Sequence, residues 1–290
     1  MTQGQFISHC TADALAGAAA ALKAGRLVSF PTETVYGLGA DATNSDAVAR
    51  VYKVKGRPAD HPLIVHVADA QDISEWSEDI PDYAIDLARS FWPGPMTLIL
   101  KRSELAKDFI TGGQETVGLR VPDHTLALAF LNEFKKIGGK GVAAPSANRF
   151  GHVSPTTSQA VVEELSGYMD ADDLILDGGP SQVGVESTII DCTASAPRIL
   201  RPGAITVEMV EAVTGTKVVN RDDVIRVSGS LEHHYAPSAQ VVLDGYPRPG
   251  DGLIALSTTP TPEGVVRLAS PINNEDFARQ LYGALREADA

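Results

Sequence analysis

The sequence predicts an α/β layered domain over residues 1–216, followed by a polar linker at 217–238 and a short α/β extension at 239–290. Three observations favour this fold class. Short apolar runs typical of strands alternate with segments of helical spacing. The 290 residues are 43% hydrophobic, so the chain can bury a large core and still form a smaller second unit. From Lys217 onward the sequence becomes polar and its pattern irregular. A mixed sheet and a purely parallel one fit this pattern equally well.

The first elements follow from caps and apolar runs. Thr11 suits the N-cap of an alanine-rich helix that ends near Gly25, because glycine readily takes the left-handed position after a helix. Residues 26–30 are typical of a strand that leads into a turn at 31–36. Ser45 is expected to cap a helix to about residue 54. Further strands are expected at 62–67, 96–100, 116–121, 141–144, 173–176 and 187–191, and further helices at 81–91, 125–134, 157–165 and 205–213.

The C-terminal extension shows a weaker pattern of the same kind. Short strands are expected at 240–243, 252–256 and 265–268, and an amphipathic helix at 274–288. These residues are few for an independent hydrophobic core. We therefore expect a small α/β unit that is reduced in size.

Composition excludes several classes of function. The net charge of −13 and the pI near 4.9 argue against a surface that binds duplex nucleic acid, which needs a basic face. Cys10 and Cys192 lie far apart and form neither a disulfide framework nor a metal motif. The N-terminus lacks the pattern of a signal peptide, and no apolar run has the length of a membrane span. We expect a soluble cytoplasmic protein without membrane contact.

The positive charge is concentrated in three windows that contain no acidic residue, at 47–59, 134–162 and 192–207. The first follows a polar turn at 30–39 that carries hydroxyls, a carboxylate and a phenol between prolines and glycines. Local clusters of cations in an acidic chain suggest a positive pocket for a small polyanion. Short acid-free windows also arise by chance in loops and buried strands, and this alternative stays open.

Individual residues in these segments have both a functional and a structural interpretation. Lys55 and Arg57 could bind phosphate, or could compensate the dipole at a helix C-terminus. Ser146 and Asn148 could contact a ligand, or could satisfy the backbone of their own turn. His66 ends an apolar strand, where a structural role is more common than a catalytic one. His233 and His234 are adjacent and have no third ligand nearby, so we expect no metal there.

Taken together, the motifs resemble those of one family, the L-threonylcarbamoyladenylate synthases of the YrdC type, in the long form with a C-terminal extension. The resemblance spans about residues 11–237. It rests on eight ordered motifs: Phe-Pro-Thr-Glu-Thr-Val-Tyr-Gly-Leu-Gly at 30–39, Lys-Gly-Arg-Pro at 55–58, Pro-Leu-Ile-Val-His at 62–66, Trp-Pro-Gly-Pro-Met-Thr at 92–97, Val-Gly-Leu-Arg-Val-Pro at 117–122, Ala-Pro-Ser-Ala-Asn at 144–148, Val-Glu-Ser-Thr-Ile-Ile at 185–190 and Leu-Arg-Pro-Gly at 200–203.

The resemblance implies a twisted mixed sheet with a large concave active-site cleft, and a set of site residues. Catalysis would involve Lys55, Arg57, Ser146 and Asn148. L-threonine would be bound by Thr32, His66, Arg120, Ala144 and Ser187. ATP would contact Lys55, Arg57, Thr116, Ser146, Ser154, Arg201 and Tyr235, the last in a linker that folds over the site. The segment after that linker is about half as long as in long-form relatives.

The resemblance also implies the reaction. A nucleotidyltransferase of this family makes threonylcarbamoyl-AMP and pyrophosphate from L-threonine, bicarbonate and ATP, with Mg²⁺ accompanying the nucleotide, and the metal's protein ligands stay unknown. Other proteins then transfer the threonylcarbamoyl group to tRNA. One alternative is an RNA-binding module of the same fold, with only weak RNA binding expected from the acidic composition. A second is a carbamoyl-transfer enzyme, whose acylphosphatase and zinc-finger segments are absent from this sequence.

Overall fold

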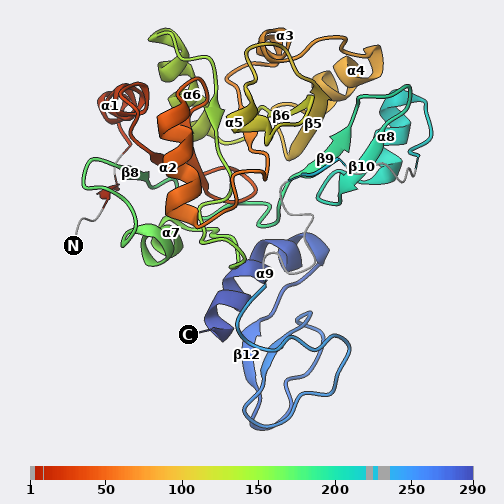
Figure 1. Ribbon diagram of the computed structural model, residues 1–290. Helices are drawn as coiled ribbons and strands as arrows, with labels where there is room; N and C mark the ends of the chain where they lie inside the picture. The colour runs from red at the N-terminus through yellow and green to blue at the C-terminus, as the bar shows by residue number, and fades with distance from the viewer. Residues whose placement is uncertain (1–3, 9, 220–224, 228–235, 290) are drawn as a thin grey trace.

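The computed structural model describes residues 4–8, 10–219, 225–227 and 236–289. Its main part is one large mixed sheet flanked by helices, and the C-terminal residues form a smaller unit beside it (Figure 1). Across the sheet the strands run in the order β1 (Gln5–Ile7), β8 (Leu174–Leu176), β2 (Val28–Phe30), β3 (Gly37–Asp41), β7 (Val142–Ala143), β4 (Ile64–His66), β6 (Thr116–Arg120), β5 (Met96–Lys101), β9 (Thr188–Asp191) and β10 (Arg198–Arg201).

The sheet is mixed, which confirms the topology that the family resemblance implies and decides between the two that the alternation of strands and helices left open. β4 runs parallel to β6, and β5 runs parallel to β9. The pairs β4 with β7, β5 with β6 and β9 with β10 are antiparallel. The order also places β7 between β3 and β4, so residues from distant motifs meet in the middle of the sheet.

The helices begin and end where capping chemistry allows. They are α1 (Ala12–Lys23), α2 (Ser45–Lys55), η1 (Ala70–Asp72), α3 (Ile73–Trp76), α4 (Asp82–Phe91), α5 (Asp108–Thr111), α6 (Thr125–Lys136), α7 (Ser158–Leu165) and α8 (Val207–Thr214). Thr11 caps α1 as expected, since its hydroxyl accepts the Ala14 N–H at 3.2 Å. The cap of α2 is Asn44 and not Ser45, because the Asn44 side chain accepts the N–H groups of Asp46 and Ala47.

Three strands were absent from the sequence prediction: β1, β3 and β10. The omission of β3 has a clear cause, because Gly37 and Gly39 make this segment look like a continuation of the preceding turn. In the sheet, a Cβ atom at Gly39 would lie 2.7 Å from Val142 and 3.0 Å from Phe30. Glycine is therefore required there by the close approach of neighbouring strands and not by a turn.

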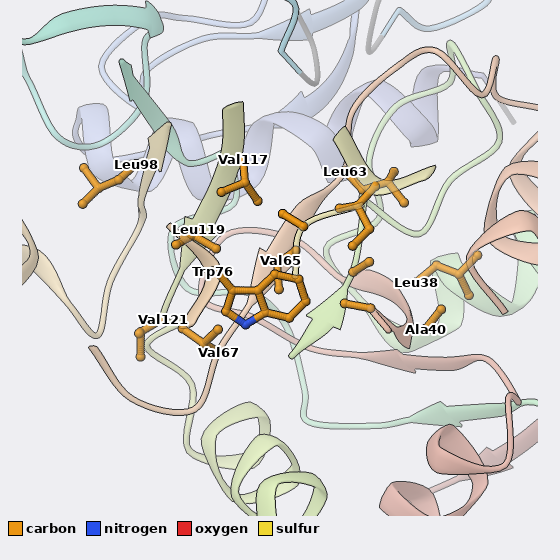
Figure 2. Close-up of a cluster of buried hydrophobic side chains, with 14 of the residues drawn as sticks. Leu38, Ala40, Leu63, Val65, Val67, Trp76, Leu98, Val117, Leu119 and Val121 are labelled. Carbon is orange, nitrogen blue, oxygen red and sulfur yellow. The ribbon is translucent and has the colours of Figure 1, made fainter. Parts of the chain in front are cut away.

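One face of the sheet packs against the largest hydrophobic core. Leu38, Val65, Leu98 and Leu119 come from four different strands of that face and belong to one buried cluster with Trp76 of α3 (Figure 2). The indole N–H donates to the carbonyl of Lys140 at 3.1 Å, which satisfies the one polar atom of this buried ring. The alternation of side chains along a strand then directs residues such as His66 and Arg120 to the opposite face.

The C-terminal unit consists of β11 (Gly252–Ile254), β12 (Val266–Ala269) and α9 (Asn274–Ala288), with β11 parallel to β12. The strand expected at 240–243 was wrong, because these residues have no regular structure and pair with no strand in the described part of the chain. Val242 and Leu243 are 68% and 85% exposed. Strand propensity alone does not make a strand where no neighbour supplies hydrogen bonds.

Two absences concern the described residues only. None of the helices there combines the length and apolar character that a membrane crossing needs. In the same residues Cys10 and Cys192 are free thiols, in agreement with the sequence prediction that they form no disulfide framework.

Candidate active site

The polar face of the sheet carries the candidate site. Alternate residues of β4 and β6 point away from the hydrophobic core. They are Ile64 and His66 in β4, and Thr116, Gly118 and Arg120 in β6. The register pairs His66 with Arg120 across these parallel strands. Two side chains that are 54 positions apart in the sequence are therefore neighbours on one face.

An open cavity lies on this face. All five residues that the resemblance assigns to L-threonine line it, together with two of those assigned to ATP. The lining consists of Thr32, Thr34, Val35, Tyr36, Gly37, Ile64, His66, Arg120, Ala144, Pro145, Ser146, Glu186, Ser187 and Arg201. Lys55, Arg57, Asn148 and Ser154 are buried and are not among the lining residues, and Thr116 lines a neighbouring cavity.

Thr32 organises the first wall of the cavity. Its hydroxyl donates to the carbonyl of Val35 at 2.6 Å and accepts the N–H groups of Thr34 and Val35 at 3.3 and 3.2 Å. The hydroxyls of Thr32 and Thr34 are 2.9 Å apart. These local bonds hold the turn after β2 in a fixed shape, so its hydroxyls and backbone present a rigid surface to a ligand.

Arg120 is held by a buried ion pair. One of its terminal nitrogens, Nη2, donates to Glu33 Oε1 at 2.6 Å, and Nε donates to the carbonyl of Gly94 at 3.3 Å. The other Glu33 oxygen accepts the N–H of Asp123 at 3.0 Å. The side chains of Arg120 and Glu33 are only 4% and 6% exposed. The pair fixes the plane of the guanidinium and leaves Nη1 without a hydrogen bond to any described residue.

His66 is a neutral imidazole beside this pair. Burial and the charge of Arg120 lower the pKa of His66 to about 3. Its Nδ1 atom is buried and has no hydrogen-bond partner within the described part of the chain. The ring stacks edge-on against Phe30, with 5.8 Å between the ring centroids. His66 therefore offers an uncharged polar group to the cavity over the whole physiological pH range.

The opposite wall comes from the segment before β9 and from the end of β10. Arg201 donates through Nε to the Ser187 carbonyl and through Nη2 to the Ser187 hydroxyl, both at 3.0 Å. Its Nη2 atom also lies 3.8 Å from Glu186, whose carboxylate accepts the Ser154 hydroxyl at 2.7 Å. Arg201, Glu186 and Ser154 thus form a connected polar group at the cavity edge.

Lys55 connects two of the sequence motifs through hydrogen bonds to the loop at 146–148. Its ammonium group donates to the carbonyls of Ser146 and Asn148, and the side chain is fully buried. Burial, assisted by the charge of Arg57, lowers the pKa of Lys55 well below its usual value. Asn148 completes the loop, because its amide donates to the carbonyls of Arg149 and His152, while its Oδ1 is buried without a partner among the described residues.

Arg57 follows Gly56, which ends α2 in the left-handed conformation. Its Nη2 donates to the carbonyl of Pro62 at 3.1 Å, and its guanidinium lies 6.0 Å from the centre of the Phe150 ring. Lys55 and Arg57 are therefore both inside the protein. These two cations are 2% and 5% exposed, so neither lies on a solvated surface. Lys55 also stands in the last turn of α2, where a cation compensates the helix dipole, so this structural interpretation is not contradicted.

The neighbouring cavity holds Thr116 and continues along the same face, since Ile64 lines both cavities. Residues 225–227 cover it. Ile225 and Val227 pack against Ile99 and Ile189, and the Arg226 side chain pairs with Asp60 at 3.0 Å. Tyr235 lies outside the described residues, as do His233 and His234, so their expected roles stay predictions.

The acid-free windows contributed unequally to this site. Lys135 and Lys140, from the second window, pair with Asp72 and Glu75 in ion pairs that are at least partly exposed. Their contribution to a positive pocket was therefore a wrong expectation. Both lysines find acidic partners more than 60 positions away in the sequence, which an acid-free window does not reveal.

Sequence reasoning did not identify Glu33 and Glu186 as site residues. Glu33 lies next to Thr32 in the polar turn, and Glu186 lies next to Ser187, so both were inside recognised motifs. No spacing relates residue 33 to residue 120, and the pairing depends on the order of strands in the sheet. In the described residues, no three acidic, histidine or cysteine side chains gather as a metal site.

The twisted mixed sheet with a polar, arginine-lined cavity on one face places this protein in the YrdC-like class of α/β domains. A family model described as "Telomere recombination", for Sua5, YciO and YrdC, matches residues 20–203. A second, described as "Threonylcarbamoyl-AMP synthase, C-terminal domain", matches residues 205–290.

Relatives agree with these matches. The threonylcarbamoyl-AMP synthase of Pyrococcus abyssi is 43% identical over 80% of this chain and 68% of that protein. The enzyme of that name from Bacillus subtilis is 40% identical over 95% of this chain and 84% of that protein. The crystal structure of P. abyssi Sua5 complexed with L-threonine has a TM-score of 0.84 at 36% identity, covering 100% of this chain and 89% of that chain. This chain belongs to the threonylcarbamoyl-AMP synthase family.

Proposed function

We propose that this protein is a nucleotidyltransferase that makes threonylcarbamoyl-AMP and pyrophosphate from L-threonine, bicarbonate and ATP. The product would supply other proteins that modify tRNA with threonylcarbamoyladenosine, and the cytoplasm, where tRNA is modified, is the proposed location. One observation carries the proposal. A single cavity collects Thr32, His66, Arg120, Ala144 and Ser187, and the P. abyssi relative of the same fold forms a complex with L-threonine.

In this proposal Arg120 binds the carboxylate of L-threonine. Glu33 and Gly94 already occupy Nη2 and Nε of Arg120, which leaves Nη1 for the substrate. Charge-assisted hydrogen bonds to carboxylates are among the stronger polar contacts in proteins. Because the guanidinium is oriented before the substrate arrives, little ordering is required on binding.

The amine of L-threonine must be uncharged to attack bicarbonate or carbon dioxide. His66 stays neutral and can accept a hydrogen bond without adding positive charge beside the amine. A neutral imidazole in this place also keeps the cavity free of a second cation beside Arg120. The proposed role of His66 is therefore to bind and orient, and not to transfer a proton as an imidazolium.

ATP would lie across the rest of the polar face, with Arg201 and Ser146 in the cavity wall and Thr116 in the neighbouring cavity. Negative charge develops on the triphosphate when the carbamate oxygen attacks the α-phosphorus. Lys55, Arg57 and Arg201 supply the positive charge that stabilises it. The Ser187 and Ser154 hydroxyls are engaged with Arg201 and Glu186. Catalysis would then come from orientation and electrostatics without a protein nucleophile.

Mg²⁺ would enter with ATP. Mg²⁺ in nucleotide sites is usually held by phosphate oxygens, waters and one or two protein oxygens, so a three-carboxylate cluster is not needed. Two oxygen donors fit this chemistry: the unpaired Oδ1 of Asn148 and the carboxylate of Glu186. When bound, the metal would neutralise part of the phosphate charge.

We also propose a division of labour along the chain. Residues 1–216 would carry the chemistry, residues 217–238 would act as a linker over the active site, and residues 239–290 would form a C-terminal extension. Residues 225–227 already contact the polar face.

The deciding experiment measures pyrophosphate release from ATP with the full chain, with and without L-threonine and bicarbonate. We expect release that depends on both compounds and on Mg²⁺. Release without L-threonine would reject the proposed substrate, and no release under any condition would reject the activity. Salt-dependent tRNA binding without pyrophosphate release would instead support an RNA-binding module of the same fold.

A further inference from the structure

The C-terminal helix α9 packs directly against the loops that form the candidate active site. In Figure 1 it lies between the main domain and β12. Tyr282 forms a small buried cluster with Val35 and Val153, and Leu281 and Leu285 pack against it. Val35 lines the cavity, and Val153 precedes Ser154. One helix of the C-terminal unit thus contacts two separate site loops.

A second contact runs from α9 to the loop that Lys55 holds. Arg286 Nη1 donates to Glu164 in α7 at 2.8 Å and to the carbonyl of Val153 at 3.3 Å. The other Glu164 oxygen accepts the backbone N–H of Arg149 at 3.2 Å. Arg149 follows Asn148, whose carbonyl accepts from Lys55. A continuous set of hydrogen bonds therefore connects α9 with the buried lysine.

The third contact is a close backbone approach. A Cβ atom at Gly184 would lie 2.4 Å from the Cα of Arg279 and 2.8 Å from the carbonyl oxygen of Ala278. Gly184 stands two residues before Glu186 in the segment that forms the opposite cavity wall. The backbone of α9 lies against this segment so closely that only glycine fits without displacement.

We propose that α9 is a positioning element of the active site, which holds the loops at 32–37, 146–154 and 184–187 in their working arrangement. This inference rests on the proposed function, because those loops matter only if the cavity binds the substrates. The loops come from distant parts of the sequence and also bond directly to one another, since the Ala147 N–H donates to the Tyr36 carbonyl and the Ser154 hydroxyl donates to Glu186. A rigid helix that touches all three restricts their relative motion.

The ion pair of Arg286 offers the sharpest test, since its side chain is 17% exposed and that of Glu164 is 12% exposed. We expect Arg286→Ala to lower kcat/KM for pyrophosphate release at least tenfold, and Arg286→Lys to restore part of the loss. Glu287→Ala is the control on the same helix. Glu287 follows Arg286 in α9 and is exposed, so this variant should stay within twofold of wild type.

Two further measurements separate positioning from a general loss of fold. Glu164→Gln should lower kcat/KM in the same direction and add little to Arg286→Ala, because both variants break one interaction. Hydrogen exchange of the α9 amides should slow when L-threonine and a non-hydrolysable ATP analogue bind to the wild-type protein, since coupling between two sites is reciprocal. A purely structural role of α9 would not respond to ligands.

These experiments distinguish failure of this inference from failure of the proposed function. If the wild-type protein releases no pyrophosphate, the proposed function fails, and this inference fails with it. If the wild type is active while Arg286→Ala and Glu164→Gln retain full kcat/KM, only the inference is overturned. Exchange rates in α9 that do not change with ligands would overturn it as well.

Discussion

At the scale of single residues, Glu33 holds the side chain of Arg120 in a fixed orientation. Their ion pair spans 2.6 Å and is almost completely buried. Breaking a buried pair leaves an uncompensated charge inside the protein, which is far more costly than losing an exposed pair of the same length. Glu33 therefore orients Arg120 and also makes its burial possible.

We expect Glu33→Gln to raise the KM for L-threonine at least tenfold and to lower the free energy of unfolding by about 3 kcal/mol, because Arg120 would lose its charged partner. The KM for ATP should change much less. Substrate-dependent pyrophosphate release and denaturant unfolding measure these two effects. Asp79→Asn is the control, since Asp79 pairs with Lys101 at the same 2.6 Å while being 75% exposed, and it should leave both quantities unchanged. An equal rise in both KM values would contradict a specific role at the carboxylate.

The lowered pKa of His66 predicts how the free energy of unfolding depends on pH. Its pKa is about 3 in the folded protein and about 6.5 in the unfolded chain. Below pH 6.5 the unfolded chain takes up a proton that the folded protein does not, so stability is lost as pH falls from about 6.5 towards 3. We expect the difference in unfolding free energy between wild type and His66→Gln to decrease over this range. Chemical denaturation at several pH values measures it, and parallel curves for the two proteins would refute the buried neutral imidazole.

At the scale of elements, the end of α2 sets the positions of the cations Lys55 and Arg57. Gly56 ends the helix in the left-handed conformation with φ 63°, between Lys55 and Arg57. A Cβ atom here would lie 2.7 Å from the Arg149 guanidinium, which itself stacks on Tyr168. The glycine thus serves both the backbone turn and the packing of the loop at 146–154.

We expect Gly56→Ala to destabilise the protein by about 1 kcal/mol through its positive φ and to reduce pyrophosphate release, since Arg149 must move. Gly215→Ala is a matched control. Gly215 ends α8 with φ 62° and has no atom within 4 Å of a Cβ, so only the stability loss should appear. Thermal unfolding and the activity assay together test this. Equal activities of the two variants would show that the Arg149 contact has no bearing on the site.

At the scale of the whole molecule, acidic composition and a cationic site coexist. The chain carries a net charge of −13, while Arg120 and Arg201 line one cavity and the buried Lys55 bonds to the carbonyl of Ser146 in its wall. Such an arrangement suits a small anionic substrate in a cavity, where a local field acts over a short distance. It does not suit a long polyanion that lies across an acidic surface.

We therefore expect tRNA to bind weakly, with a dissociation constant above about 10 μM at 0.15 M salt, because nonspecific affinity depends on neutralised phosphates. Fluorescence anisotropy with labelled tRNA measures this. Tight binding with a steep salt dependence would contradict the prediction and would support the RNA-binding alternative.

The C-terminal unit is also understood only at this scale. Its two short strands and one helix bury little by themselves, and Tyr246 and Leu243 are 100% and 85% exposed. Tyr282 of helix α9 is buried in a cluster with Val35 and Val153 of the main domain. The unit and the site loops consequently depend on each other.

Local information in the sequence predicted most helices and central strands, because caps, glycines and the alternation of apolar residues act over a few positions. Thr11, the periodicity of α4 and the apolar runs of β4 and β5 needed no knowledge of the rest of the chain. β3 and β10 were missed, and a strand at 240–243 was wrongly expected, because strand formation depends on a partner in space.

The sequence by itself determined the α/β class and the motifs that carry the family resemblance, since both are written in local patterns. The family resemblance also implied that the sheet is mixed, as the structure confirms. Only the tertiary structure decided that Glu33 holds Arg120, that Lys55 binds the carbonyls of Ser146 and Asn148, and that α9 touches the site loops. The physical reason is common to all three: each contact joins residues that no spacing in the sequence relates, and strand order is what brings Glu33 and Arg120 together.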